Sequence, residues 1–149
     1  MRGLSFIVDG ELFVVDVTLV RKVARRMTVT SIFTAPDAVV GIANMKGSVV
    51  TLLSLFELLG RKQSGKDRIA KTVDAVIFKS FSHSEDQMGL IIDKPGGLID
   101  IDENSIRPPA PATGAEENLC ISGLADIDDR LYRIISIDAI SRRFDKYGE

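Results

Sequence analysis

The sequence has few of the residue types that commonly mark catalytic or metal sites. Among 149 residues it has one cysteine, one histidine and no tryptophan. A single Cys120 excludes an intrachain disulfide, and Cys120 with His83 alone is too small a donor set for a zinc site. We therefore expect no metal, no cofactor and a reducing compartment.

Long apolar runs are also absent. No stretch approaches the roughly 20 apolar residues of a membrane span. The apolar run near the N-terminus ends at Asp9 and is too short for a signal-peptide core. We expect a cytoplasmic protein that does not insert into a membrane.

One motif resembles a nucleotide-binding loop but lacks a residue that such a loop requires. Residues 60–66 spell the G-x-x-x-x-G-K pattern of a phosphate-binding loop, but Asp67 stands where a hydroxyl should bind magnesium, and its charge would repel phosphate. His83 lies in a polar turn with no nucleophile motif beside it, and Cys120 lies in an apolar segment. The sequence therefore predicts a protein that is not an enzyme.

The most informative feature present is an internal repeat. Residues 41–58 and 123–140 align without a gap at an offset of 82 and keep an apolar residue at most matching places. A shorter match relates Phe13–Asp16 to Leu90–Asp93, and another relates Ala35–Pro36 to Ala110–Pro111. A fixed offset that preserves the apolar pattern predicts one supersecondary unit used twice.

The local patterns favour short strands. Segments 4–8 and 11–17 flank Asp9-Gly10, which is typical of a hairpin turn. The spacing of apolar residues in Thr18–Arg25 predicts a short helix or a single helical turn. Pro95-Gly96-Gly97 is expected to interrupt a strand. The other expected elements are strands at 39–45, 49–55, 73–79, 88–93, 98–101, 119–125 and 131–137, a helical turn at 56–59, a linker at 60–71, a turn at 82–87 and a closing helix at 138–146.

This pattern predicts a mostly all-β protein built from two small barrels. We expect a single domain over residues 1–149, with a first barrel at about 10–71 and a second at about 72–149. The N-terminal strand at 4–9 is the candidate for completing the second barrel.

Charge differs between the halves. Residues 1–71 carry 11 Lys/Arg and 6 Asp/Glu, a net +5, whereas residues 72–149 carry 8 and 15, a net −7. Such a division favours contact with different partner surfaces. The basic cluster Arg21, Lys22, Arg25 and Arg26 has no aromatic residue beside it for base stacking, so nucleic acid is not an expected partner. Asp126, Asp128 and Asp129 lack the spacing of a calcium loop.

Several motifs together resemble the CheW family of chemotaxis coupling proteins over nearly the whole chain. They are VTLVRKV at 17–23, Ala35-Pro36, GIANMKGSVVTLLSL at 41–55, the I-x-P-x-x-P pattern from Ile106 and GLADIDDRLYRIISI at 123–137. The resemblance implies a pair of five-stranded SH3-like β-barrels related by pseudo-twofold symmetry, with short helical turns and a C-terminal helix. It also implies a non-enzymatic adaptor that links the cytoplasmic tips of methyl-accepting chemoreceptors to the regulatory domain of a CheA-type histidine kinase.

The resemblance also implies roles for particular residues. It implies receptor contact at Val20, Lys22, Asn44, Lys46 and Gly47. For the kinase we assign the charged turn Asp126, Asp128, Asp129 and Arg130 as a hypothesis. The chain resembles a divergent member of the family, because Lys22, Lys46, Thr51 and Ser54 replace the family's usual Glu, Arg, Pro and Asp. Recruitment to membrane-associated receptor arrays follows from the same resemblance. The alternative from the residues alone is a small-barrel module that binds nucleic acid or another peptide partner.

Overall fold

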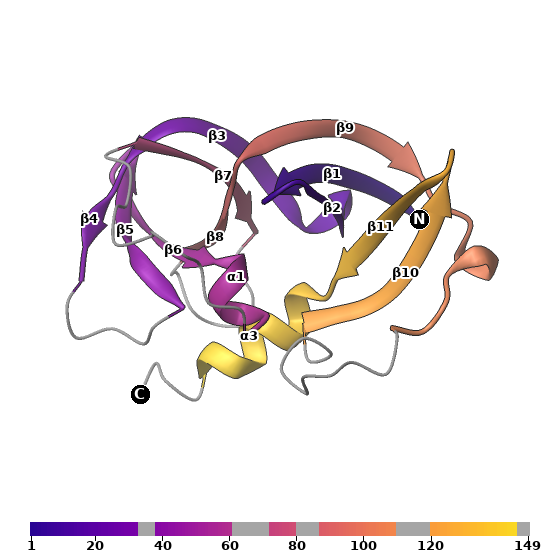
Figure 1. The fold of residues 1–149 in the computed structure, drawn as a ribbon. Helices are drawn as coiled ribbons and strands as arrows, with labels where there is room; N and C mark the ends of the chain where they lie inside the picture. The colour runs from indigo at the N-terminus through magenta and orange to yellow at the C-terminus, as the bar shows by residue number, and fades with distance from the viewer. Residues whose placement is uncertain (33–37, 61–71, 80–86, 110–119, 146–149) are drawn as a thin grey trace. The chain divides into compact units, whose positions relative to one another are not determined.

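The structure is a computed structural model that describes residues 1–32, 38–60, 72–79, 87–109 and 120–145 (Figure 1). It divides the chain into two compact units, each built on one β-sheet. Unit 1 combines Met1–Leu19 with Lys94–Glu149, and unit 2 is the continuous segment Val20–Asp93. The mostly all-β class is therefore confirmed.

Unit 2 contains a six-stranded sheet in the order β3-β7-β8-β6-β5-β4. One hydrophobic cluster of its core contains the buried residues Ala24, Met27, Ala43, Val50, Leu52, Ala75 and Ile77. Strands β6 and β8 run parallel, and every other pair is antiparallel. The elements are β3 (Val20–Thr28), β4 (Thr30–Ser31), β5 (Val39–Met45), β6 (Ser48–Ser54), α1 (Leu55–Leu58), β7 (Thr72–Phe78) and β8 (Gln87–Ile92).

Unit 1 contains a five-stranded sheet in the order β10-β11-β2-β1-β9. Here the parallel pair is β11 with β2. The buried core residues are Val14, Ile101, Ala125, Tyr132 and Ile134. The elements are β1 (Arg2–Val8), β2 (Glu11–Asp16), the 3-10 helix η1 (Val17–Leu19), β9 (Lys94–Asp100), the 3-10 helix η2 (Glu103–Ser105), β10 (Ile121–Ile127), β11 (Arg130–Ile135) and α3 (Ile137–Asp145).

The internal repeat is confirmed residue by residue. Adding 82 to each partner in the β5–β6 register, from Met45↔Ser48 back to the bulge at Gly41↔Leu52, reproduces the β10–β11 register. Each hairpin is followed by a helix, α1 or α3 (Figure 1). A serine side chain accepts from a backbone N–H three residues on at both helix starts, Ser54 from Glu57 and Ser136 from Ala139.

The two sheets also correspond strand by strand across the rest of each unit. Leu52 of β6 pairs with Gly89 of β8, and its counterpart Ile134 of β11 pairs with Val14 of β2. Gly89 then pairs with Ile77, and Val14 with Ser5. Thus β1 and β2 fill in unit 1 the places that β7 and β8 fill in unit 2, and β9 corresponds to β3.

This correspondence accounts for unit boundaries that differ from the expected division near residue 71. The first half of the sequence supplies β3 to β6 to unit 2 but sends β1 and β2 to unit 1. The second half supplies β9 to β11 to unit 1 but sends β7 and β8 to unit 2. Each unit is therefore completed by a strand pair from the other half.

Of the short helix or single helical turn predicted at Thr18–Arg25, the helix is wrong and only a turn at its start is present. Only η1 (Val17–Leu19) is helical, and the chain continues as β3, which pairs with β7. Cross-strand pairing outweighs a weak local helix preference here. The predicted interruption at Pro95-Gly96-Gly97 is also wrong, because β9 continues through it and accommodates the glycines in a bulge.

Most other expected elements are confirmed within a few residues, the closing helix among them as α3. Two expectations cannot be compared. The linker predicted at 60–71, apart from Gly60, and the turn predicted at 82–87, apart from Gln87, lie outside the described residues.

Each hairpin has a glycine at a position where a side chain would collide with a neighbouring backbone, Gly41 in unit 2 and Gly123 in unit 1. A Cβ at Gly41 would lie 2.3 Å from the Thr30 carbonyl oxygen, and one at Gly123 would lie 3.1 Å from the Arg107 carbonyl oxygen. Both glycines let a neighbouring backbone approach the bulged end of the hairpin, through β4 in unit 2 and through the Arg107↔Leu124 bridge in unit 1.

We predict that Gly41→Ala lowers the free energy of unfolding by about 2–3 kcal/mol, because the Thr30 backbone must move to make room. Gly97→Ala is the matched control, since nothing lies within 4 Å of a Cβ there, and it should change stability by less than about 1 kcal/mol. Urea unfolding curves measure both. Equal losses for the two variants would contradict the close approach.

Candidate functional site

The β5–β6 turn brings together three of the residues predicted to contact a receptor. Lys46 and Gly47 occupy the turn with φ angles of 52° and 84°, a left-handed geometry that favours glycine. The Asn44 side-chain oxygen accepts a hydrogen bond from the Gly47 N–H at 3.0 Å. This bond holds the turn in shape and leaves the exposed Lys46 side chain at its tip.

An exposed apolar residue extends this turn surface. Val49 pairs with Asn44 across the hairpin, and 53% of its surface is accessible. Val49 is the second residue of β6, directly after the turn, so its exposed side chain is available for contact with another molecule beside the charged and polar turn residues. The sequence interpretation missed Val49, because in the sequence it looks like one more residue of a buried strand.

The other two predicted receptor residues lie on a different strand of the same sheet. Val20 begins β3 and pairs with Phe78, and the exposed Lys22 follows two residues later. Strands β7, β8 and β6 separate β3 from β5 in the sheet order, although β3 also contacts β5 directly. The five residues therefore form two groups on unit 2, one at the hairpin turn and one on β3.

The turn between β10 and β11 is the unit 1 counterpart of the Lys46–Gly47 turn, with reversed charge. Asp128 and Asp129 occupy the same left-handed positions, with φ angles of 51° and 63°. Asp126 corresponds to Asn44, and its carboxylate pairs with Arg107 instead of capping the turn. Asp126, Asp128 and Asp129 with Arg130 form one exposed group at the tip of the hairpin.

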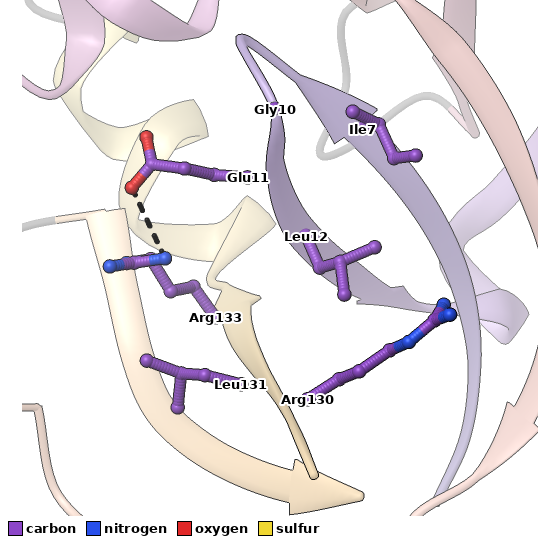
Figure 2. A pocket seen from close by; sticks show the side chains of 7 residues that line it. All are labelled: Ile7, Gly10, Glu11, Leu12, Arg130, Leu131 and Arg133. Atoms are coloured by element: carbon purple, nitrogen blue, oxygen red, sulfur yellow. Dashed lines mark ion pairs between the residues drawn. The ribbon is translucent and has the colours of Figure 1, made fainter. Parts of the chain in front are cut away.

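A shallow pocket of about 470 Å³ opens beside this turn in unit 1 (Figure 2). Its lining consists of Ile7, Gly10, Glu11, Leu12, Arg130, Leu131 and Arg133. The parallel pairing of β11 with β2 creates it, because that pairing places Tyr132 opposite Leu12 and Arg133 opposite Phe13. Residues far apart in the sequence meet here, so no local pattern could have predicted the pocket.

The pocket combines apolar and charged walls. Arg133 and Glu11 form an ion pair at 3.2 Å, with 23% and 27% of their side chains accessible. Figure 2 shows this pair on one side of Leu12 and the Arg130 side chain on the other. An arginine beside partly exposed leucines can receive a partner's apolar side chain together with a carboxylate. Arg130 was predicted as a site residue, whereas the other lining residues were missed.

Three observations bear on other chemistry. Among the described residues, no cluster of three or more His, Cys, Asp or Glu could hold a metal ion. Cys120 is buried, and His83 lies outside the described residues, as do residues 61–66 of the phosphate-loop pattern. None of the helices within the described ranges is long and apolar enough to cross a membrane.

Comparisons with known proteins agree across the chain. The model of the CheW-like domain family matches residues 2–145. The chain is 23% identical to the chemotaxis protein CheW of Helicobacter pylori over 143 residues, 96% of this chain and 82% of that protein. It is also 23% identical to the chemotaxis protein CheW of Rhizobium meliloti over 137 residues, 92% of this chain and 84% of that protein.

A solved structure is similar as well. The crystal structure of the scaffolding protein TtCheW from Thermoanaerobacter tengcongensis superposes with a TM-score of 0.75 at 29% sequence identity. The match covers 91% of this chain and 88% of that one. The similarity confirms the expected pair of SH3-like barrels.

We predict that Glu11 and Arg133 contribute a coupling free energy of about 0.5–1 kcal/mol to stability, because both side chains are partly shielded from water. A double-mutant cycle with Glu11→Gln and Arg133→Gln measures it. The Arg2–Asp100 pair, with 62% and 79% of its side chains exposed, is the control and should couple close to zero. Equal coupling in the two cycles would contradict this assignment.

Proposed function

The chain belongs to the CheW-like domain family, and we propose that it is a non-enzymatic chemotaxis adaptor that couples chemoreceptor cytoplasmic tips to a CheA-type histidine kinase. The observation that carries the proposal is the family match over residues 2–145, which spans both units. The similarity to a protein described as a scaffold supports it. Receptors and kinase are the partners, and the adaptor is cytoplasmic and recruited to receptor arrays.

An adaptor needs at least two surfaces with different binding preferences, and the two units provide them. Unit 1 carries 8 Lys/Arg and 14 Asp/Glu, a net −6, whereas unit 2 carries 11 and 7, a net +4. The scaffold is duplicated, so this difference is not imposed by the fold. Opposite charges favour different partners and fix their orientation on encounter.

We assign receptor contact to unit 2. The Asn44, Lys46 and Gly47 turn presents a rigid backbone with one cation, and Val49 adds apolar area beside it. This combination suits a partner surface on which a carboxylate lies next to apolar side chains, and we expect such a surface on the receptor tip. Lys46 offers a point charge instead of the planar fork of an arginine, which weakens geometric selectivity and keeps the sign.

We assign kinase contact to unit 1, at the Asp126, Asp128, Asp129 and Arg130 turn with the neighbouring pocket. The turn supplies charge that orients the kinase regulatory domain, and the pocket supplies apolar walls at Leu12 and Leu131. Buried apolar anchors within a charged rim are the usual anatomy of a protein interface. The pocket thereby adds apolar contact area to the charges of the turn.

Co-sedimentation tests the proposal. The protein should pellet with membranes that carry a chemoreceptor and with a CheA-type kinase, and pellet less when either is omitted. Failure of the wild-type protein to pellet in the complete mixture would contradict the adaptor function.

Within that assay, we predict that Lys46→Glu lowers the affinity for a receptor cytoplasmic fragment about tenfold, equivalent to about 1.4 kcal/mol. The reversed charge would repel the carboxylate that Lys46 attracts. Arg142→Glu is the control, because Arg142 is also an exposed cation, lies on α3 in unit 1 and pairs with Asp138 four residues earlier. Unchanged capture by Lys46→Glu would remove Lys46 from the site while leaving the adaptor function open to the complete assay.

A further inference from the structure

One strand carries an unusual concentration of positive charge. Arg21, Lys22, Arg25 and Arg26 all lie on β3, and all four are exposed. They fall within six consecutive residues, which span roughly 17 Å of an extended strand. The buried residues of β3 are Ala24 and Met27, which belong to the unit 2 core.

Two bulges make this concentration possible. Side chains alternate between the faces of a regular strand, so neighbouring residues cannot both face water when one face is buried. In β3 the register shifts between Val20 and Lys22 and again between Ala24 and Met27. Each shift places two residues opposite one, and Arg26 takes a φ of 55° at the second. The bulges thus turn both cationic pairs outward.

The duplicated fold shows that the barrel does not require these cations. Arg21 and Lys22 lie opposite Ile77, and the corresponding bulge of β9 opposite Ser5 contains Gly96 and Gly97 instead. The cations are therefore a property of this surface and not of the architecture.

Further along β3 and β9, one pair of corresponding positions carries opposite charges. Arg25 of β3 pairs with Asp74 of β7, whereas at the matching place Asp100 of β9 pairs with Arg2 of β1. An ion pair therefore occupies the same place in both units, but the strand that supplies the base in one unit supplies the acid in the other. Strand β9 consequently presents an acid where β3 presents a base.

Within the part of the chain that the structure describes, little negative charge offsets the cations of β3. Asp74 is the acid beside them, and it pairs with Arg25 at 3.8 Å and accepts a hydrogen bond from the Arg26 N–H at 3.0 Å. Only 19% of the Asp74 side chain is accessible. Among the described residues, the side chains of Arg21, Lys22 and Arg26 form no ion pair. Three cations are left to face solvent together.

We propose that the exposed face of β3 is a docking site for an acidic helical segment of a protein partner. A helix of about three turns is as long as the cationic stretch, so carboxylates one turn apart on one face can meet successive cations. The inference rests on the proposed function in one respect, because Val20 and Lys22 of β3 belong to the receptor surface. It adds the chemistry of the partner, which is acidic where it meets β3.

Other polyanions fit this surface less well. No aromatic residue lies on β3 for nucleic-acid bases to stack on, and no exposed large apolar residue lies there to enter a lipid bilayer. A long polyanion would extend beyond β3 and be repelled by a protein whose net charge is −2, whereas a short acidic helix would contact β3 alone.

Binding of defined probes to the full chain tests the proposal. One probe is a fluorescent 20-residue helical peptide with Glu at every third or fourth position, and its control has Gln at those positions. Duplex DNA of 20 base pairs and vesicles containing phosphatidylserine are the competing probes. The variants are Arg21→Glu with Lys22→Glu, the milder Arg21→Gln with Lys22→Gln, and the charge-matched control Lys94→Glu with Arg142→Glu.

We expect the Glu peptide to bind more tightly than the Gln peptide, and more weakly as salt rises. The double variant Arg21→Glu with Lys22→Glu should bind the Glu peptide at least tenfold more weakly than wild-type protein. The double variant Arg21→Gln with Lys22→Gln should lose less affinity, and the control variant Lys94→Glu with Arg142→Glu should lose little. Equal binding of the two peptides, retention of affinity by the Glu double variant, or tighter β3-dependent binding to DNA or vesicles would overturn the proposal. The Gln double variant, which introduces no repulsion, keeps the test valid if the Glu double variant fails to fold.

Co-sedimentation separates this inference from the function on which it rests. If wild-type protein enters the receptor–kinase pellet and the Arg21→Glu with Lys22→Glu variant enters it equally well, the β3 site is overturned and the adaptor function stands. If wild-type protein itself does not enter the pellet, the adaptor function fails. Preferential binding of the Glu peptide would then still support an acidic partner at β3.

Discussion

The parallel pairing of β6 with β8 and of β11 with β2 is the constraint on which the rest of the structure depends. In both pairs the two strands come from different halves of the sequence. Neither half can therefore complete a sheet alone, and the chain must cross between the units at Leu19–Val20 and at Asp93–Lys94. The pocket beside Arg130 exists only because β2 lies against β11.

The same architecture lets the two units diverge in charge. Their backbones match through the hairpin register, whereas the turn residues are Lys46-Gly47 in one unit and Asp128-Asp129 in the other.

The hairpins and their helices could be predicted from the sequence because the repeat at offset 82 preserves both the buried positions and the glycine that the bulge requires. The shorter match of Phe13–Asp16 to Leu90–Asp93 was less exact, since the structure aligns Val14 with Gly89, two residues out of that register. An even shift keeps each side chain on the same face, so the apolar pattern could not detect it.

Other features could not be predicted, for two physical reasons. The helix expected at Thr18–Arg25 failed because bulges abolish the two-residue period of β3 and leave spacings that resemble a helix. The strand exchange and the pocket depend on pairings between distant segments, and local patterns carry no information about which strand lies beside which. For the candidate site, the Lys46-Gly47 turn was inferred from the family resemblance and the Asp126–Arg130 turn from its charges, and both stay predictions. Val49, Leu12 and Leu131 look like ordinary core residues in the sequence.

The most direct test of the exchanged strands is fragment complementation, with the chain divided between residues 71 and 72. Amide proton spectra of the fragments 1–71 and 72–149 should each lack the dispersion of a folded sheet, because neither fragment holds all the strands of either sheet. Fragment 1–71 lacks β7 and β8 of unit 2 and β9 to β11 of unit 1, and fragment 72–149 lacks β1 and β2 of unit 1 and β3 to β6 of unit 2. An equimolar mixture should regain the spectrum of the intact chain. A native-like, cooperatively unfolding barrel in either fragment alone would contradict the account.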